Sequence, residues 1–264
     1  MAESTGDMTT VVNVEDWNFK KSNTRYSTHG SHTWLAAMIP ALACKLIKKT
    51  KPTHLLDPFC GGGTVCVEAV LNNISTVWVD VNPLSAIVTQ TKTTLVDKLS
   101  VEEILSNTLK EAKKSKKRKL YYPDHEKYLV SYWFKTEHLK FLDSIARTIT
   151  TIQDQKLKTF FQCVFSATIR DVSLTYRNEI RLRKLEPQDL AKFDRDVLET
   201  FSRRTLDTLS RIQSLPKKIN AKFMIGDVKK LPFKNNEFST IICSPPYGDE
   251  RNGVPYFQFV KNML

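Results

Sequence analysis

The sequence predicts an α/β fold in which a block of helices interrupts a parallel, doubly wound sheet between its second and third strands. An apolar run over residues 54–56 ends in Asp57, and a turn with three glycines and a helical pattern follow it. A second, β-branched run ends in Asp80, so the two runs and the segment between them have the order of a β-α-β unit. Residues 93–216 then contain no glycine, and their apolar residues recur at helical spacing. We therefore expect a disordered terminus over residues 1–17, the first half of the sheet domain over 18–92, a helical insertion over 93–216, and the third and fourth strands over 217–264.

The glycine-rich turn after the first strand predicts a nucleotide-type binding site. Glycine has no Cβ, so the backbone amides of Gly61 to Gly63 can approach a ligand closely. Asp80 follows this turn by about 20 residues, the spacing at which dinucleotide folds place a ribose-binding carboxylate. The turn is neither a G-x-G-x-x-G nor a phosphate-binding loop that ends in Gly-Lys-Ser/Thr, so by itself it is a weak signal.

Two further strands are expected after the insertion. Residues 221–227 form an apolar run that ends in Asp227, and residues 238–243 lead into Ser244-Pro245-Pro246-Tyr247. The carboxyl ends of parallel strands meet at one edge of a sheet, where open α/β sheets bind ligands. Upstream of the first strand, the polar segment 23–32 precedes an apolar periodic stretch, Trp34 to Ile47, that we expect to be a helix.

Composition indicates an intracellular protein with a polyanionic partner. The 264 residues include 40 Lys plus Arg against 28 Asp plus Glu, a net charge of +12, although a basic surface can also serve solubility alone. The chain has five cysteines, an odd number, and no two of them form a C-x-x-C motif, so we expect reduced thiols and no metal site. The sequence has no apolar run of the roughly 20 residues that span a bilayer and no signal peptide, so we expect no membrane partner and a cytoplasmic location, at the nucleoid when DNA is bound.

Two motifs together carry a family resemblance. Asp57-Pro58-Phe59-Cys60-Gly61-Gly62-Gly63-Thr64 resembles the D-P-F-x-G-x-G-T loop of the DNA amino-methyltransferases, and Ser244-Pro245-Pro246-Tyr247 resembles their S/D/N-P-P-Y catalytic loop. Thr24 to His32 is similar to a family segment upstream of the cofactor loop, and the chain departs from that segment at residues 33–35. The resemblance covers residues 18–264 and implies a Rossmann-like class I methyltransferase sheet.

The resemblance implies a site for S-adenosylmethionine. Asp57 would lie near the methionine amino group, and Asp227 would face the adenine, although either carboxylate could instead cap a turn. The upstream segment would close over the methionine end of the cofactor. The implied cofactor-binding residues are Thr28, His29, Gly30, Asp57, Pro58, Phe59, Cys60, Gly61, Gly63, Thr64, Asp80, Val81 and Asp227.

The chemistry of the second motif favours methylation of an exocyclic amine. The lone pair of such an amine is delocalised into the aromatic ring, so the amine is a poor nucleophile. Ser244 and the Pro245 carbonyl can accept its two hydrogens, while Pro246 fixes the backbone and Tyr247 stacks on the base. Cys243 precedes the motif and is interpreted as a strand residue and not as the nucleophile of ring-carbon methylation.

The favoured substrate is cytosine in double-stranded DNA, within a restriction-modification system. In the resembling family, Ser at the first motif position occurs mainly with cytosine, and Asp or Asn with adenine. The base must be flipped out of the duplex to reach the site. Lys116, Lys117 and Arg118 lie in a run of cations that is either a solvated loop or a phosphate contact, and Arg170 could contact DNA or form a local pair with Asp171.

The resemblance leaves three alternatives for function and one expectation about assembly. The alternatives are adenine methylation in DNA, amino-methylation of RNA, and a non-catalytic subunit that binds nucleic acid. A complete fold of this class has about three more strands after the catalytic loop, so the C-terminal strands are expected to be missing. Either the enzyme is split, and a second polypeptide or a homodimer completes the sheet, or the chain is truncated.

Overall fold

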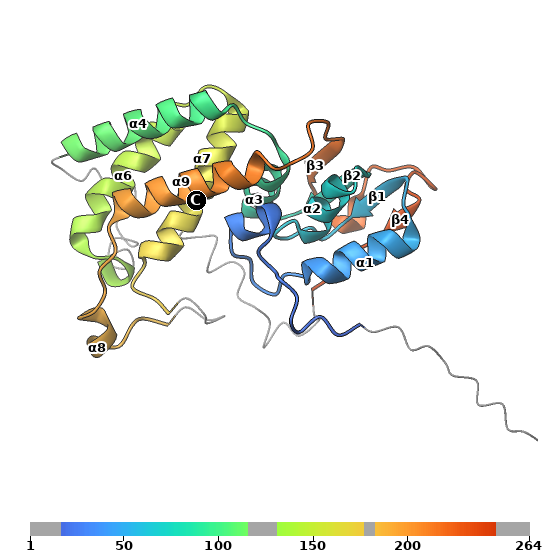
Figure 1. Ribbon diagram of the computed structural model, residues 1–264, viewed down its shortest axis with the longest axis horizontal. Coiled ribbons are helices and arrows are strands. Elements are labelled where there is room, and N and C mark those ends of the chain that lie inside the picture. Colours follow the sequence, from blue (N-terminus) through green and yellow to red (C-terminus); the bar gives the residue numbers. More distant parts are fainter. Residues whose placement is uncertain (1–16, 116–130, 177–182, 247–264) are drawn as a thin grey trace, which may run out of the picture.

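A computed structural model describes residues 17–115, 131–176 and 183–246 of the chain. The molecule is elongated, with the sheet and helices α1 (Pro40–Thr50) and α2 (Thr64–Leu71) at one end and the helices of the insertion at the other (Figure 1). Helix α3 (Pro83–Thr93) lies between the two ends. The predictions for residues 1–16, for Lys116 to Arg118 and for Tyr247 lie outside the described residues.

The four described strands form one parallel sheet, as the sequence predicts. They are β1 (His54–Asp57), β2 (Ser75–Asp80), β3 (Ala221–Ile225) and β4 (Thr240–Ile241), in the spatial order β3-β2-β1-β4. Because all neighbours run parallel, the residues that follow each strand meet at one edge of the sheet. The glycine-rich turn and the Ser244 segment therefore come together from opposite ends of the sequence.

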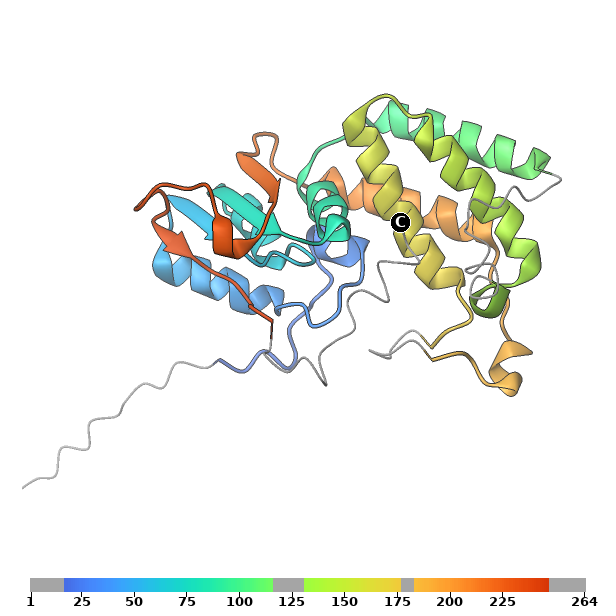
Figure 2. The same cartoon turned by 180° about the vertical axis from the view of Figure 1, so that it is seen from behind.

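Alternation along β1 and β2 gives the sheet two apolar faces. Leu55 packs with helices α1 and α2 through residues such as Ala43, Val65 and Ala69. Leu56 points to the other face and packs with Val77 and Val79, against apolar residues of the segment that joins β3 to β4. This connection lies on the side of the sheet seen in Figure 2.

The insertion forms its own helical layer around the largest apolar core of the described chain. Its helices are α4 (Lys98–Lys114), α6 (Thr136–Thr150), α7 (Gln155–Val172), α8 (Pro187–Leu190) and α9 (Val197–Ile212). Asp97, Asp154 and Asp196 cap α4, α7 and α9 by accepting a hydrogen bond from the third backbone amide that follows each. Helix α7 packs on α3, and α9 packs on the short 3-10 helix η1 (Ser27–Ser31). The insertion is therefore joined to the rest of the molecule through α3 and η1.

The structure corrects three predicted elements. The stretch expected to be a helix from Trp34 becomes helical only at Pro40, because residue Ile39 before the proline is extended and Ala36 has a φ of 50°. The helical pattern predicted over residues 93–216 is interrupted after residue 190, since α8 ends at Leu190 and Asp196 starts α9. The fourth strand is confined to Thr240–Ile241, shorter than the predicted residues 238–243.

All five cysteines are free thiols. Within the described ranges, no helix has the length and apolar character required to cross a membrane.

Candidate active site

A cavity of about 440 Å³ opens at the carboxyl edge of the strands. Five segments line it, namely residues 34–38, 57–65 without Gly63, 80–83, 226–228 and 244–246. The structure thus brings together most of the predicted cofactor residues and the catalytic motif in one cavity. Those that line it are Asp57, Pro58, Phe59, Cys60, Gly61, Thr64, Asp80, Val81, Asp227, Ser244, Pro245 and Pro246.

The glycine turn can exist only without side chains at its centre. A Cβ added to Gly62 would lie 2.5 Å from the Cβ of Trp34, so the indole side chain occupies the space directly over this residue. Gly63 caps α2 with a φ of 78°, a conformation that favours glycine. Gly63 therefore shapes the turn, although it does not line the cavity.

Hydrogen bonds from β2 and α3 fix the orientation of the turn. The Gly61 amide donates to Asp80 Oδ2 at 2.7 Å. The Gly61 carbonyl accepts from Ser85 Oγ at 2.6 Å and from Thr89 Oγ1 at 3.3 Å, and the Gly62 carbonyl accepts from Lys92 Nζ at 2.8 Å.

We refer to Ser85, Thr89 and Lys92 as the α3 donor row. Sequence reasoning missed it, although its spacing of i, i+4 and i+7 places three donors on one face of a helix. Burial lowers the pKa of the Lys92 amine to about 8. A buried amine is costly unless it has a hydrogen-bond partner, and here the partner is the Gly62 carbonyl. We infer that the Lys92 side chain serves to hold this carbonyl.

Asp57 is a buried carboxyl group at the wall of the cavity. Its side chain is 2% exposed, and its Oδ1 accepts a hydrogen bond from the Phe59 amide at 3.1 Å. Burial raises the pKa of Asp57 to about 7, with a further upward contribution from Asp80, while the Phe59 amide opposes the rise. A cationic group in the cavity would favour the ionised form, so the site fits a ligand with an ammonium group.

The upstream residues Thr28, His29 and Gly30 are placed differently from the prediction. They do not line the cavity but are buried between α2, α3 and α9. Thr28 Oγ1 donates to the Lys92 carbonyl at 2.8 Å, and a Cβ on Gly30 would lie 2.5 Å from the Arg211 guanidinium. The cavity wall is formed instead by the following residues, Trp34 to Met38.

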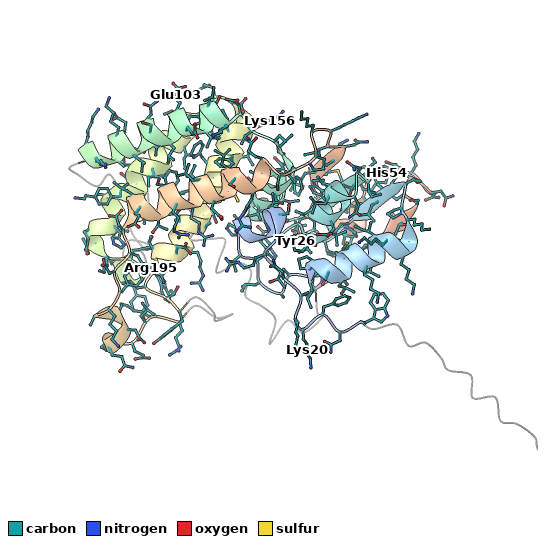
Figure 3. The ribbon with its side chains drawn as sticks, in the orientation of Figure 1. Lys20, Tyr26, His54, Glu103, Lys156 and Arg195 are labelled. Atoms are coloured by element: carbon teal, nitrogen blue, oxygen red, sulfur yellow. The ribbon has the colours of Figure 1, made fainter. Side chains whose placement is uncertain are left out.

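A buried polar cluster holds this upstream segment on α2. Glu68 Oε1 accepts from His29 Nε2 at 2.8 Å and from the Tyr26 hydroxyl, and Tyr26 lies at the junction of the sheet and the insertion (Figure 3). Burial lowers the pKa of His29, and Glu68 opposes that shift. Burial lowers the pKa of His32 to about 3, so this ring is neutral. Its Nδ1 donates to the Thr33 carbonyl at 2.7 Å, and its Nε2 accepts from Ser166 Oγ at 3.1 Å. These histidines anchor the segment that carries Trp34.

The catalytic motif follows an edge strand that is pinned to β1. The Ile242 amide donates to the Leu56 carbonyl at 3.1 Å, which places Ser244 next to the end of β1. Ser244 is half-buried, whereas Pro245 and Pro246 are exposed at the mouth of the cavity. Burial raises the pKa of the neighbouring Cys243 thiol, which disfavours its use as a nucleophile.

Arg170 lies on α7 in the insertion and does not line the cavity. Its guanidinium donates to Thr175 Oγ1 and, at 3.0 Å, to the Tyr176 carbonyl. Asp171 accepts from Arg204 at 2.7 and 2.8 Å and from Arg203 at 3.2 Å, so it joins α7 to α9. DNA contact by Arg170 stays a prediction.

No group of three or more His, Cys, Asp and Glu residues that could hold a metal ion occurs in the part of the chain that the structure describes.

In sequence, this chain is similar to known methyltransferases. A family model described as "RMKL-like, methyltransferase domain" matches residues 30–127. The type II methyltransferase M.MvaI of Kocuria varians is 32% identical over 271 residues, which cover 92% of this chain and 58% of that protein. The type II methyltransferase M.MjaII of Methanocaldococcus jannaschii is 26% identical over 110 residues, or 39% of this chain and 21% of that protein. No solved structure matches significantly. The chain thus spans little more than half the length of the first of these relatives.

Proposed function

Because this chain is related to the type II methyltransferases of restriction-modification systems, we propose that it transfers a methyl group from S-adenosylmethionine to the amino group of a flipped cytosine in DNA. The observation that carries the proposal is the meeting of two distant motifs in one cavity. Asp57 to Thr64 and Ser244 to Pro246 line the same space, although about 180 residues separate them in the sequence.

The residues that would hold the cofactor are those of the glycine turn and its neighbours. Asp57 offers a buried carboxyl group to an ammonium, and Asp80 and Asp227 border the cavity at the ends of the next two strands. Trp34 and the apolar residues after it add an apolar part to the cavity wall. When bound, S-adenosylmethionine supplies an electrophilic methyl group on sulfonium.

Ser244 and Pro245 would activate the target amine. The Ser244 hydroxyl and the Pro245 carbonyl can each accept an N–H hydrogen bond, which draws the amine lone pair out of conjugation with the ring. These groups sit at the mouth of the cavity, where a flipped base can reach them and a base within a duplex cannot. No covalent intermediate with the protein is required.

Cytosine is favoured over adenine by the serine at the first position of the motif. The same geometry also permits adenine methylation, which is the second candidate. Amino-methylation of RNA and a non-catalytic role in nucleic-acid binding stay as further alternatives, and the assay below separates them.

A second chain that completes the sheet also stays a proposal. In the described sheet β4 is an outer strand with only two residues, and Ile241 is 60% exposed on it. Sedimentation equilibrium of the purified chain would show a dimer if a second copy covers this strand.

The test is transfer of labelled methyl groups to mixed-sequence duplex DNA, followed by nucleoside analysis. The proposal expects label on the cytosine amino group and a loss of about 100-fold in Ser244→Ala, with cofactor affinity unchanged. Ser239→Ala is the matched control, because Ser239 Oγ donates to the His54 carbonyl outside the cavity. It removes a hydroxyl beside β4 but no group from the motif.

Each alternative has its own outcome in this assay. Label on the adenine amino group would show that adenine is the target base in place of cytosine. Label on RNA but not on DNA would show that RNA is the substrate. Equal transfer by Ser244→Ala and the unsubstituted chain would contradict the assigned role of Ser244. DNA binding without cofactor binding would favour the non-catalytic alternative.

A further inference from the structure

In the described part of the chain, the charged side chains that line the cavity are all acids. Asp57, Asp80 and Asp227 contribute carboxyl groups to the wall, and no described Lys, Arg or His joins them there. The buried Lys92 amine donates to the Gly62 carbonyl but does not line the cavity. Most other lining residues are apolar, and charges interact more strongly beside such surface than in bulk water. The cavity is therefore suited to a ligand that carries positive charge.

Trp34 adds an aromatic surface to this acidic wall. A Cβ built on Gly62 would lie 2.5 Å from the Trp34 Cβ, and one built on Gly61 would lie 2.9 Å from the indole Nε1. The side chain therefore extends across both of these glycines. Trp34 is half-buried and lines the cavity, so part of its side chain is open to a ligand.

Packing on α3 fixes the position of the indole in the absence of a ligand. Trp34 packs against an apolar cluster that includes Leu84 and Val88 of this helix. Two residues before Trp34, the buried ring of His32 donates a hydrogen bond to the Thr33 carbonyl at 2.7 Å. A side chain that is already held in place loses little conformational freedom on binding, so more of its attraction for a ligand appears as affinity.

The face of an aromatic ring distinguishes a cation from a neutral group of similar shape. It attracts a cation within about 6 Å of the ring centre, and tryptophan attracts cations more strongly than the other aromatic side chains do. S-adenosylmethionine carries a sulfonium, whereas the product that remains after methyl transfer, S-adenosylhomocysteine, has an uncharged thioether at the same place. A sulfonium has no N–H or O–H to donate to a carboxylate, so an aromatic face is a suitable partner for it.

We propose that Trp34 recognises the positive charge of the sulfonium and shifts the preference of the cavity from the demethylated product toward the methyl donor. This inference rests on the proposed function, because it takes S-adenosylmethionine as the cofactor. The carboxylates of the wall favour the same charge through Coulomb attraction, and the indole adds a contact that needs no hydrogen bond. Trp34 is thus a specificity residue for the cofactor, in addition to covering the glycine turn.

The test measures the affinities of three ligands for the full chain by titration calorimetry without DNA. They are S-adenosylmethionine, S-adenosylhomocysteine, and sinefungin, in which a carbon with an amino group replaces the sulfonium. Trp34→Leu keeps an apolar side chain but removes the aromatic face. It should weaken binding of the two cationic ligands about tenfold and binding of the uncharged thioether less than about threefold. Trp34→Phe, with a weaker aromatic face, should give losses between those of Trp34→Leu and the unsubstituted chain.

A matched variant and a second readout separate charge recognition from packing. Trp17→Leu removes an indole that is 41% exposed and does not line the cavity, so all three affinities should stay the same. S-adenosylmethionine should change the tryptophan fluorescence of Trp17→Leu but not of Trp34→Leu, because Trp78 and Trp133 do not line the cavity either. Thermal unfolding shows whether each variant is folded, and Trp34→Phe carries the test if Trp34→Leu is not.

Equal losses for all three ligands in a folded Trp34 variant would overturn the inference and leave Trp34 as a packing residue. Methyl transfer to DNA by the unsubstituted chain would then show that the proposed function stands without it. An unsubstituted chain that binds none of the three ligands would contradict the proposed function, and this inference with it.

Discussion

The two loops that border the cavity are built in opposite ways. The glycine turn is buried beneath Trp34, and α3 and Asp80 hold its carbonyl and amide groups. The Ser244 loop follows a strand of two residues, and two of its residues are exposed at the mouth of the cavity. The side that would hold the cofactor is therefore organised before any ligand arrives, whereas the side that would hold the base is supported at the edge of the sheet. Substitutions in the first loop should act on cofactor binding, and substitutions in the second on transfer.

The largest expected effect concerns Lys92. Its pKa falls from the ordinary value of 10.5 to about 8, so the folded protein binds this proton less tightly than the unfolded chain does. The buried charge therefore destabilises the fold fully below pH 8, and this destabilisation disappears as the pH rises to 10.5. Across this range the free energy of unfolding of the unsubstituted protein should rise by about 3 kcal/mol relative to that of Lys92→Met, which has no amine to titrate. Denaturant unfolding at a series of pH values measures it.

Lys92→Met should also weaken cofactor binding by about tenfold, because the Gly62 carbonyl loses its donor. Lys156→Met, at an exposed position on α7, controls for the loss of a lysine. A variant that keeps full cofactor affinity would show that the α3 donor row does not organise the turn.

The next effect is that of filling the space under the indole. Gly62→Ala should weaken cofactor binding by about 100-fold, because its Cβ would lie 2.5 Å from the Cβ of Trp34. Gly226→Ala is the matched control in the same cavity, since its Cβ would meet Val79 only at an ordinary 3.5 Å. Titration calorimetry measures both.

Adding Trp34→Ala to Gly62→Ala should recover part of the loss. Additive effects of the two substitutions would contradict the contact between the indole and the turn.

A smaller effect is expected from the protonation of Asp57. Its pKa is raised to about 7, so the carboxylate that would bind an ammonium is present above this pH and is lost as the pH falls through it. Cofactor affinity should therefore drop about tenfold for each pH unit below 7. Asp57→Asn should bind weakly at every pH and lose this dependence. An unchanged pH profile in that variant would assign the titration to another group.

The smallest effect is expected at the anchor of the upstream segment. Tyr26→Phe removes one of the hydrogen bonds to Glu68 and should lower the free energy of unfolding by about 1 kcal/mol. Thr28 and Arg211 still hold the segment, so cofactor affinity should change less than about twofold. A large loss of affinity with normal stability would instead support direct contact of this segment with the cofactor.

Sequence reasoning correctly predicted that the ends of the strands meet in one place, because parallel strands leave little freedom. Once β1 and β2 are recognised, Asp57 and Asp80 must lie at the same edge of the sheet, and the structure places both in the cavity wall. The Ser244 motif follows for the same reason, since β4 pairs in parallel with β1.

The remaining wall could not be predicted because it depends on contacts distant in sequence. Trp34 was expected in a helix, but that helix starts only at the proline six residues later, and the turn at Leu35 and Ala36 leaves the indole over the glycines. The family resemblance placed Thr28 and His29 at the cofactor, yet their partners in the structure are the Lys92 carbonyl and Glu68. A resemblance in sequence does not distinguish a side chain that binds a ligand from one that anchors a loop.

Titration of the purified chain alone with S-adenosylmethionine at pH 8 tests most directly whether the cofactor side is organised in advance. Calorimetry should show saturable binding of one cofactor per chain in the absence of DNA and of any second polypeptide. A folded chain that binds no cofactor under these conditions would contradict the account.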